Sequence, residues 1–130
     1  MLSLLPVMEK SHLYRIELCS NDPRWINSRA ALTAEGRDAK GSPCGRVAAH
    51  NFDETSSRVL QRLSILSPPC ATFEAYLYIS PHTLPENNEI AEVGEIKATL
   101  CLFDGEELLR REELSVNPWG GITRRLLLGD

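Results

Sequence analysis

The sequence predicts a mainly β protein, built either as an antiparallel β-sandwich or as a sheet with one helix packed against it. The first observation is the alternation of apolar and polar side chains over residues 96–102, which is typical of a half-buried strand. The second is Asp104-Gly105, a strong hairpin signal because glycine tolerates the positive φ of such turns. An α+β fold is the alternative.

Length and composition predict one domain over residues 1–130. The chain has 130 residues, 42% of them hydrophobic and 25% charged, which is ordinary for a protein that buries a core. No apolar run approaches the roughly 20 residues of a membrane span. Pro6 interrupts an N-terminus that has no basic region before it. We therefore expect no signal peptide, no transmembrane segment and no membrane partner, and a location in the cytoplasm or inside an assembled particle.

Two segments near the N-terminus carry strand signals. Residues 12–19 alternate regularly, with Tyr14, Ile16 and Leu18 directed toward a core, and they predict a strand. Residues 29–35 are compatible with a short strand or a helical turn, and the sequence does not choose between them.

Residues 53–66 carry the best helix signal in the chain. Asp53 is a favourable N-cap, and Glu54 lies in the first turn, where the helix dipole favours an anion. Two prolines after Ser67 stop the segment. One helical face collects the apolar side chains Val59, Leu60, Leu63 and Leu66. A strand over residues 58–66 competes, and we favour the helix because of its cap and its stop.

Residues 72–80 give the clearest single strand. Tyr76 and Tyr78 lie on one face, and the opposite face collects Phe73, Ala75, Leu77 and Ile79. Apolar bulk on both faces predicts a central strand that is covered on both sides. Residues 122–128 predict a last strand.

The register of the hairpin follows from matching its two strands. A three-residue loop at residues 104–106 places Ile96 opposite Leu114 and keeps apolar residues together, so we favour it over a two-residue loop. The competing interpretation makes residues 106–114 a helix with internal Glu–Arg pairs.

Cysteine and histidine side chains supply no catalytic or metal-binding signature. The cysteines are widely spaced and include no CxxC pair, so we expect no metal site and no cofactor; they are Cys19, Cys44, Cys70 and Cys101. The histidines lie in no recognisable motif, and neither a nucleophile elbow nor an HExxH sequence occurs. We expect a protein that is not an enzyme.

Residues 36–46 hold three glycines and a proline and predict a connecting loop. Gly36 and Gly41 have the spacing of a phosphate-binding loop, but Ser42-Pro43 stands where that motif has lysine and a hydroxyl residue. Anion binding by the loop is an alternative hypothesis that rests on Arg37, Lys40 and Arg46.

The two halves of the chain differ in charge. Residues 1–65 hold nine basic and seven acidic side chains, net +2, and residues 66–130 hold five basic and eleven acidic ones, net −6. This balance disfavours nucleic acid as a partner, because phosphate binding needs a basic stripe. It fits a partner protein with a basic surface, bound by the acidic side chains of the hairpin, Glu107, Glu112 and Glu113.

Both tryptophans follow prolines in predicted turns. Tryptophan is enriched among the hot spots of interfaces, so Trp25 and Trp119 are candidate partner contacts. The structural explanation, which we favour, is that each ring folds over an open end of the sheet and caps the core.

These observations predict a non-enzymatic protein–protein binding module, such as an assembly component, an adaptor or a small inhibitor of another protein. The first alternative is a small-molecule or anion-binding protein, enzymatic or not, that uses residues 36–46. The second is a structural homo-oligomer that pairs strand edges.

Overall fold

The computed structural model describes residues 11–81, 95–117 and 120–129. Its elements, in chain order, are β1 (Tyr14–Cys19), the 3-10 helix η1 (Pro23–Asn27), β2 (Ser28–Arg37), β3 (Pro43–His50), β4 (Phe52–Asp53), β5 (Arg58–Val59), β6 (Arg62–Leu66), β7 (Thr72–Pro81), β8 (Ile96–Asp104), β9 (Glu107–Val116) and β10 (Ile122–Leu128).

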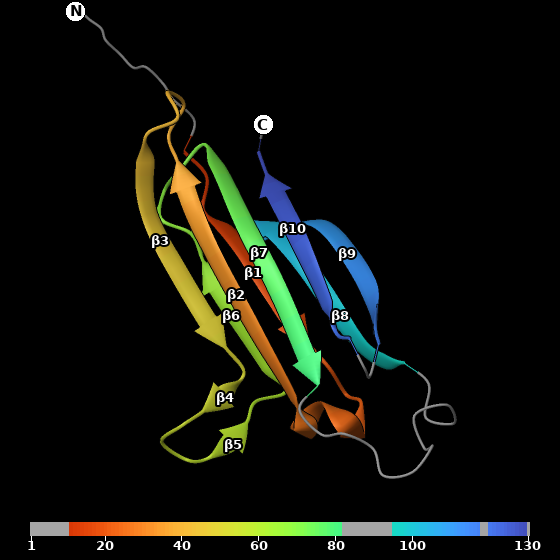
Figure 1. Cartoon of the computed structure of the whole chain (residues 1–130). Helices are drawn as coiled ribbons and strands as arrows, with labels where there is room; N and C mark the ends of the chain where they lie inside the picture. The colour runs from red at the N-terminus through yellow and green to blue at the C-terminus, as the bar shows by residue number, and fades with distance from the viewer. Residues whose placement is uncertain (1–10, 82–94, 118–119, 130) are drawn as a thin grey trace, which may run out of the picture.

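Two antiparallel four-stranded sheets pack face to face as a β-sandwich. The front sheet has the order β10-β7-β2-β3, the back sheet has the order β6-β1-β8-β9, and β4 and β5 form a short hairpin below them (Figure 1). The predicted mainly β, antiparallel fold is confirmed. No helix in the described ranges is long and apolar enough to cross a membrane.

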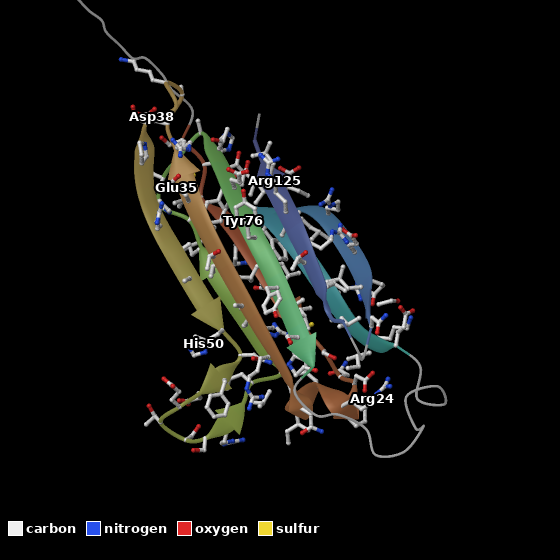
Figure 2. The ribbon with its side chains drawn as sticks, viewed as in Figure 1. Arg24, Glu35, Asp38, His50, Tyr76 and Arg125 are labelled. Atoms are coloured by element: carbon white, nitrogen blue, oxygen red, sulfur yellow. The ribbon has the colours of Figure 1, made fainter. Side chains whose placement is uncertain are left out.

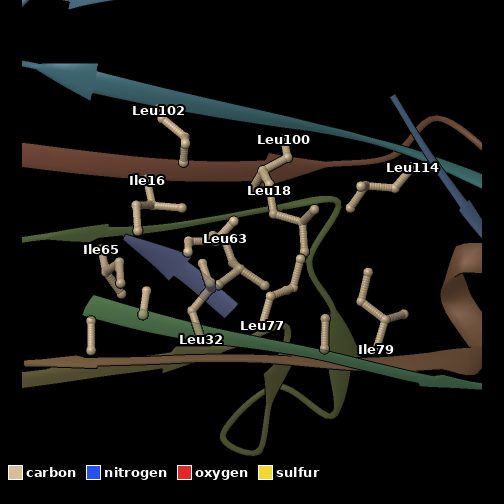
Figure 3. Close-up of a cluster of buried hydrophobic side chains, with 14 of the residues drawn as sticks. Ile16, Leu18, Leu32, Leu63, Ile65, Leu77, Ile79, Leu100, Leu102 and Leu114 are labelled. Atoms are coloured by element: carbon tan, nitrogen blue, oxygen red, sulfur yellow. The ribbon is translucent and has the colours of Figure 1, made fainter. Parts of the chain in front are cut away.

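The core lies between the sheets and takes every second residue of their strands. Leu18 and Leu100 of the back sheet and Leu32 and Leu77 of the front sheet are all at most 1% exposed (Figure 3). Each such leucine contributes about 1.5–3 kcal/mol by leaving water. The strands predicted near residues 12–19, 72–80, 96–102 and 122–128 are confirmed, and the ambiguous segment 29–35 is part of β2.

β7 is a central strand of the front sheet, as predicted, but it is covered on one face only. Its inner side chains are buried, whereas Tyr76 is 53% exposed and Tyr78 is 51% exposed on the outer face. Aromatic residues favour strands on exposed faces as well as buried ones, so the sequence pattern does not distinguish the two cases.

Residues 36–46 are not a connecting loop, because β2 and β3 extend into them and leave 38–42 as a turn. The carboxylate of Asp38 builds this turn, since its Oδ1 accepts the backbone N–H groups of Lys40 and Ser42, each at 2.9 Å. A high glycine content therefore marks the end of a hairpin here.

The predicted helix over residues 53–66 is wrong, and the competing strand is partly right, because the segment contains β5 and β6. Asp53 caps a tight turn instead of a helix: its Oδ1 accepts the N–H of Thr55 at 3.0 Å. Ser57 then adopts a φ of +55°, which is incompatible with a right-handed helix. β6 buries alternate side chains, which is the period of a strand.

Residues 107–114 lie in β9, so the competing helix is wrong, and the predicted three-residue loop is wrong as well. The turn has two residues and begins at Gly105, whose φ is +61°. A bulge then slides β9 so that Ile96 lies opposite Val116 instead of Leu114. From Leu102 to Ile96 the slide between the expected and observed partners is two residues, so Leu114 still points inward. On the other side of the bulge, Leu108 lies opposite the outward Phe103 and points outward.

Charged side chains close the sandwich between β9 and β10. Glu112 lies opposite Leu100, so it points toward the inner face. Its Oε2 is 2.6 Å from Nη2 of Arg124, which lies opposite Leu77 in the front sheet. The pair thus bridges the two sheets at their open side.

Candidate functional site

The outer surface of the front sheet carries the candidate site. We define the tyrosine face as its outward side chains in three neighbouring rows: Leu127, Glu74, Glu35 and Arg46; Arg125, Tyr76, Thr33 and Ala48; and Thr123, Tyr78, Ala31 and His50. Figure 2 shows Glu35, His50, Tyr76 and Arg125 on this surface.

Two tyrosine rings and a leucine form the apolar part of the tyrosine face. Tyr76 is 53% exposed, Tyr78 is 51% exposed and Leu127 is 58% exposed. Residues two apart on a strand are separated by about 7 Å and point to the same side, so the two rings are neighbours. Large side chains exposed together in this way are typical of an interaction surface.

Small side chains beside the tyrosines leave the surface hollowed. Thr33 and Ala48 border a hollow of about 470 Å³ next to Tyr76. Ala31 borders a second hollow of about 330 Å³ next to Tyr78. The tyrosine rings therefore project above the small side chains of β2 and β3, and a partner's side chain can enter the hollows beside them.

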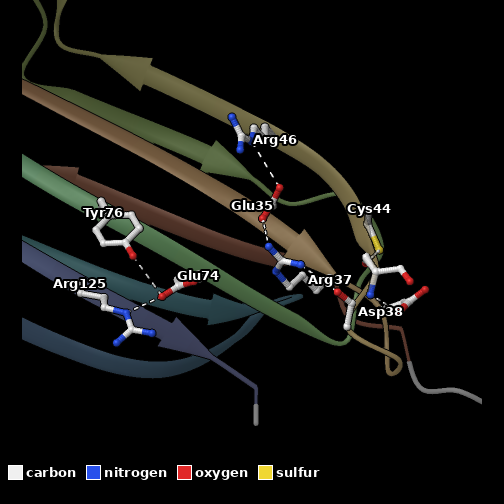
Figure 4. Close-up of polar contacts among 10 residues, drawn as sticks. Glu35, Arg37, Asp38, Cys44, Arg46, Glu74, Tyr76 and Arg125 are labelled. Carbon is white, nitrogen blue, oxygen red and sulfur yellow. Dashed lines mark hydrogen bonds and ion pairs between the residues drawn. The ribbon is translucent and has the colours of Figure 1, made fainter.

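Glu74 orients one of the rings. The hydroxyl of Tyr76 donates to Oε2 of Glu74 at 3.3 Å, and the same oxygen accepts a hydrogen bond from Nε of Arg125 (Figure 4). The hydrogen bond and the charge of Glu74 raise the pKa of Arg125. Tyr76 is thereby held along the strand, which lowers the entropy that it would lose on binding.

A second ionic group lies at the upper end of the tyrosine face. Oε1 of Glu35 is 2.6 Å from Nη2 of Arg37, and its Oε2 is 3.3 Å from Nε of Arg46 (Figure 4). Arginines outnumber carboxylates on the outer side of β2, β3, β7 and β10, where the charged side chains are Arg29, Arg37, Arg46, Arg125, Glu35 and Glu74.

On the outer surface of the back sheet, an arginine covers the aromatic ring of Phe103. The guanidinium carbon of Arg15 lies 4.1 Å from the ring centroid of Phe103. A cation over the ring covers one aromatic face and keeps it from a partner. Exposed neighbouring aromatic rings are thus a feature of the front sheet.

The tryptophan hypothesis fails for Trp25, and the favoured capping explanation is correct for this residue. Trp25 is 2% exposed, and its Nε1 donates to the carbonyl oxygen of Leu60 at 2.9 Å. The ring in η1 therefore closes one end of the core and cannot reach a partner. Trp119 lies outside the described residues.

The three glutamates of the hairpin do not form one surface. Glu107 is exposed at the end of β9 next to the turn. Glu112 bridges to Arg124 between the sheets. Glu113 lies on the outer side of the back sheet, where its Oε1 accepts the hydroxyl of Thr99 at 3.0 Å. They point in different directions and two of them already have partners.

Two of the three basic side chains of segment 36–46 are paired within the protein, because Arg37 and Arg46 both contact Glu35. Asp38 accepts the backbone N–H groups of Lys40 and Ser42, which an external anion would need, and Lys40 itself is exposed at the turn. The hairpin thus supplies its own anions, and the structure gives no support to an anion site there.

The cysteines are free thiols that lie apart from the tyrosines. Burial raises the pKa of Cys70, which makes it a poor nucleophile, and Cys44 is exposed on β3. In the described parts of the chain, no group of three or more His, Cys, Asp or Glu side chains is placed to hold a metal ion.

Sequence reasoning missed the tyrosines as functional candidates. The signal was present, because Tyr76 and Tyr78 alternate with buried residues in a strong strand. The sequence pattern alone predicts a second covered face. The small residues that lie beside them come from β2 and β3, and only the sheet pairing reveals that neighbourhood.

Comparisons with known proteins support the fold. A scan against protein-family models finds no match, and a search of curated proteins finds none. A domain of unknown function, DUF4425, from Bacteroides vulgatus ATCC 8482 is similar in structure, with a TM-score of 0.58 and 10% identity over 93% of this chain and 98% of that one. A DUF4425 family protein from Bacteroides ovatus ATCC 8483 has a TM-score of 0.54 and 8% identity, over 91% of this chain and 94% of that one. At such identities the likeness concerns the fold alone.

Proposed function

We propose that the protein is a non-enzymatic protein–protein binding module, such as an assembly component, an adaptor or a small inhibitor, and that the tyrosine face is its contact surface. The observation that carries the proposal is the pair of rings at Tyr76 and Tyr78, each more than half exposed at the centre of a hollowed sheet surface.

The chemistry of this surface suits a protein partner. Tyrosine is enriched among interface hot spots and offers a large contact area at low entropic cost, because its side chain has two rotatable bonds. Leu127 adds exposed apolar surface one row away, and arginine, which is also enriched at interfaces, borders the rings at Arg125.

The front sheet is large enough to form a substantial part of a protein–protein interface. The four strands of the front sheet have seven to ten residues, so the sheet measures roughly 19 Å by 23–33 Å, or about 400–600 Å². A standard interface buries about 800 Å² on each partner. The tyrosine face and its borders therefore supply at least half of a specific interface.

The test is a double substitution of the two rings. The tagged protein is used to capture partners from the source cells, the partner is identified and purified, and its Kd is measured by calorimetry. Tyr76→Ala with Tyr78→Ala should raise that Kd at least about tenfold, which is about 1.4 kcal/mol. Leu66→Ala with Leu109→Ala is the matched control, because these exposed apolar side chains lie on the back sheet. Equal Kd values for the wild type and the tyrosine variant would refute the assignment.

A further inference from the structure

Three of the four edges of the two large sheets have structural features that prevent another strand from pairing with them. β6 is short, with five residues. β9 directs Arg110 and Glu112 toward the inner face and contains a bulge. β10 directs Arg124 inward in the same way. Short strands, bulges and inward charges are the features that blunt an exposed edge.

The fourth edge, β3, begins with Pro43 and a bulge opposite Gly36 and Arg37, but over Gly45–His50 the described strand has none of these features. It has eight residues and forms the end of the front sheet (Figure 1). Its register with β2 is regular from Gly45 to His50, and its inward residues over that stretch are Gly45, Val47 and Ala49, which carry no charge. Pro43 stands at the first position of the strand, outside this regular stretch.

The hydrogen-bonding phase of β3 can be deduced from the residue that follows it. The N–H of Asn51 donates to the carbonyl of Ala30 at 3.1 Å, in line with the β2–β3 register. Backbone groups alternate in direction along an antiparallel ladder. Ala49 therefore bonds toward β2, and Ala48 directs its N–H and C=O groups away from β2, toward the open edge.

The side chains of β3 determine which side chains an additional strand beside this edge would need. Arg46 is 82% exposed and touches Glu35 through Nε, and His50 is exposed on the same face. The segment Pro43–His50 contains no acidic residue. A strand added beside β3 would place one set of alternate side chains next to Arg46 and His50, and the other set next to Val47 and Ala49.

We propose that β3 receives an extended segment of a partner protein, in which carboxylates alternate with small apolar residues, as an additional strand of the front sheet. This rests on the proposed function, since the added strand lies beside the tyrosine face. Main-chain hydrogen bonds supply affinity, and the alternate side chains supply specificity. A second copy of β3 fits less well, because it brings the basic side chains Arg46 and His50 of one copy to those of the other.

The experiment measures binding of a fluorescent nine-residue peptide of alternating Glu and Val, with a Lys and Val peptide as its counterpart. Ala48→Pro removes the outward N–H and should raise the Kd of the acidic peptide at least tenfold without lowering the melting temperature. Ala49→Pro is the matched control, because it removes an N–H bonded to β2 and should destabilise the fold.

Charge is tested separately, which keeps the proposal open to refutation if Ala48→Pro does not fold. Arg46→Glu should weaken the acidic peptide at least tenfold and improve binding of the basic one. Arg62→Glu, on the edge strand of the other sheet and 69% exposed, should change either Kd less than twofold. Amide NMR shifts caused by the acidic peptide should centre on β3.

Three results would overturn the proposal. The acidic peptide fails to bind at about 1 mM; it binds Ala48→Pro as well as the wild type; or the protein self-associates in sedimentation and Ala48→Pro abolishes this, which assigns the edge to a second copy. The Kd of a purified partner can also rise with the tyrosine substitutions and not with Ala48→Pro. This result would support the proposed function and refute the added strand.

Discussion

The strongest stability prediction concerns Asn51, a polar residue with 0% exposure at the junction between β3 and β4. Its Oδ1 accepts the N–H of Ala30 at 2.9 Å, and its Nδ2 donates to the carbonyl of Ser28 at 3.1 Å. Its carbonyl accepts the N–H of Leu60 at 2.6 Å. The side chain of Asn51 thereby holds the beginning of β2, and its backbone carbonyl holds the residue that follows β5.

Asn51→Ala removes the side-chain bonds and leaves two buried backbone groups without these partners. Ser28 is 0% exposed and Ala30 is 2% exposed, so bulk water does not replace the lost bonds. The Ser28 carbonyl still accepts a hydrogen bond from Nη1 of Arg29 at 3.2 Å, so the N–H of Ala30 is the group left unsatisfied. An unsatisfied buried group costs about 1–3 kcal/mol and a lost hydrogen bond about 1 kcal/mol, which together predict a loss of about 3 kcal/mol. For a chain of this length the melting temperature should fall by roughly 10 °C.

Urea denaturation followed by tryptophan fluorescence measures this loss, because Trp25 bonds to Leu60 next to the same hairpin. Asn27→Ala is the control: Asn27 is exposed at the end of η1, and its loss should stay within about 0.5 kcal/mol. A loss below about 1 kcal/mol for Asn51→Ala would show that the junction does not depend on these hydrogen bonds.

Three further predictions concern charge and backbone geometry. The Arg24 hydrogen bond lowers the pKa of Asp22 from 3.8 to about 2, so the pair stabilises the fold above about pH 4 and loses this effect as the pH falls through 2. Allowing for solvent screening, Asp22→Asn should cost about 1 kcal/mol in denaturation at pH 7 and only a small fraction of this near pH 2, where the Asp22 carboxyl is half protonated. Gly121→Ala should cost about 2 kcal/mol or more, because φ is +68° and the added Cβ would overlap the carbonyl oxygen of Ile79, whereas Gly120→Ala meets open space and should be neutral by thermal melting. A double-mutant cycle on Glu112 and Arg124 should give a coupling of about 1 kcal/mol that falls at high salt, and a zero coupling at low salt would contradict the bridge between the sheets.

The faces of the strands were predictable from the sequence, but the register was not. Alternation alone places Ile96 and Leu114 inward, because the side-chain period of a strand is independent of its partner. The pairing depends on a bulge, which adds a residue without changing the alternation of the first strand. A matching argument that assumes a regular ladder therefore misplaces the partners, and it assigns the correct faces only on one side of the bulge, since Leu108 points outward.

The segment 53–66 shows a different limit. Its apolar residues satisfy a helical pattern and a strand pattern at once, and Asp53 is equally suited to begin a helix or a tight turn. Burial of Leu63 and Ile65 against the core selects the strand, and that packing is a tertiary effect absent from a local pattern. The helix was therefore a reasonable local inference that the sandwich overrides.

The candidate site could not be predicted from the sequence alone, for a related reason. Whether an aromatic face on a central strand is a second core or an open surface depends on what the rest of the chain supplies to cover it. In the described residues the second layer lies on one side of the front sheet only, so Tyr76 and Tyr78 are left exposed. The sequence does not reveal the free edge at Gly45–His50 of β3 either, because Pro43 and Gly45 near the start of this strand are typical of a loop. Both features belong to one sheet, and the acidic hairpin belongs to the other. Substitutions in the two sheets therefore distinguish binding through the acidic hairpin of the back sheet from binding through the tyrosine face of the front sheet. Loss of binding that is caused only by substitutions in the front sheet favours the tyrosine face.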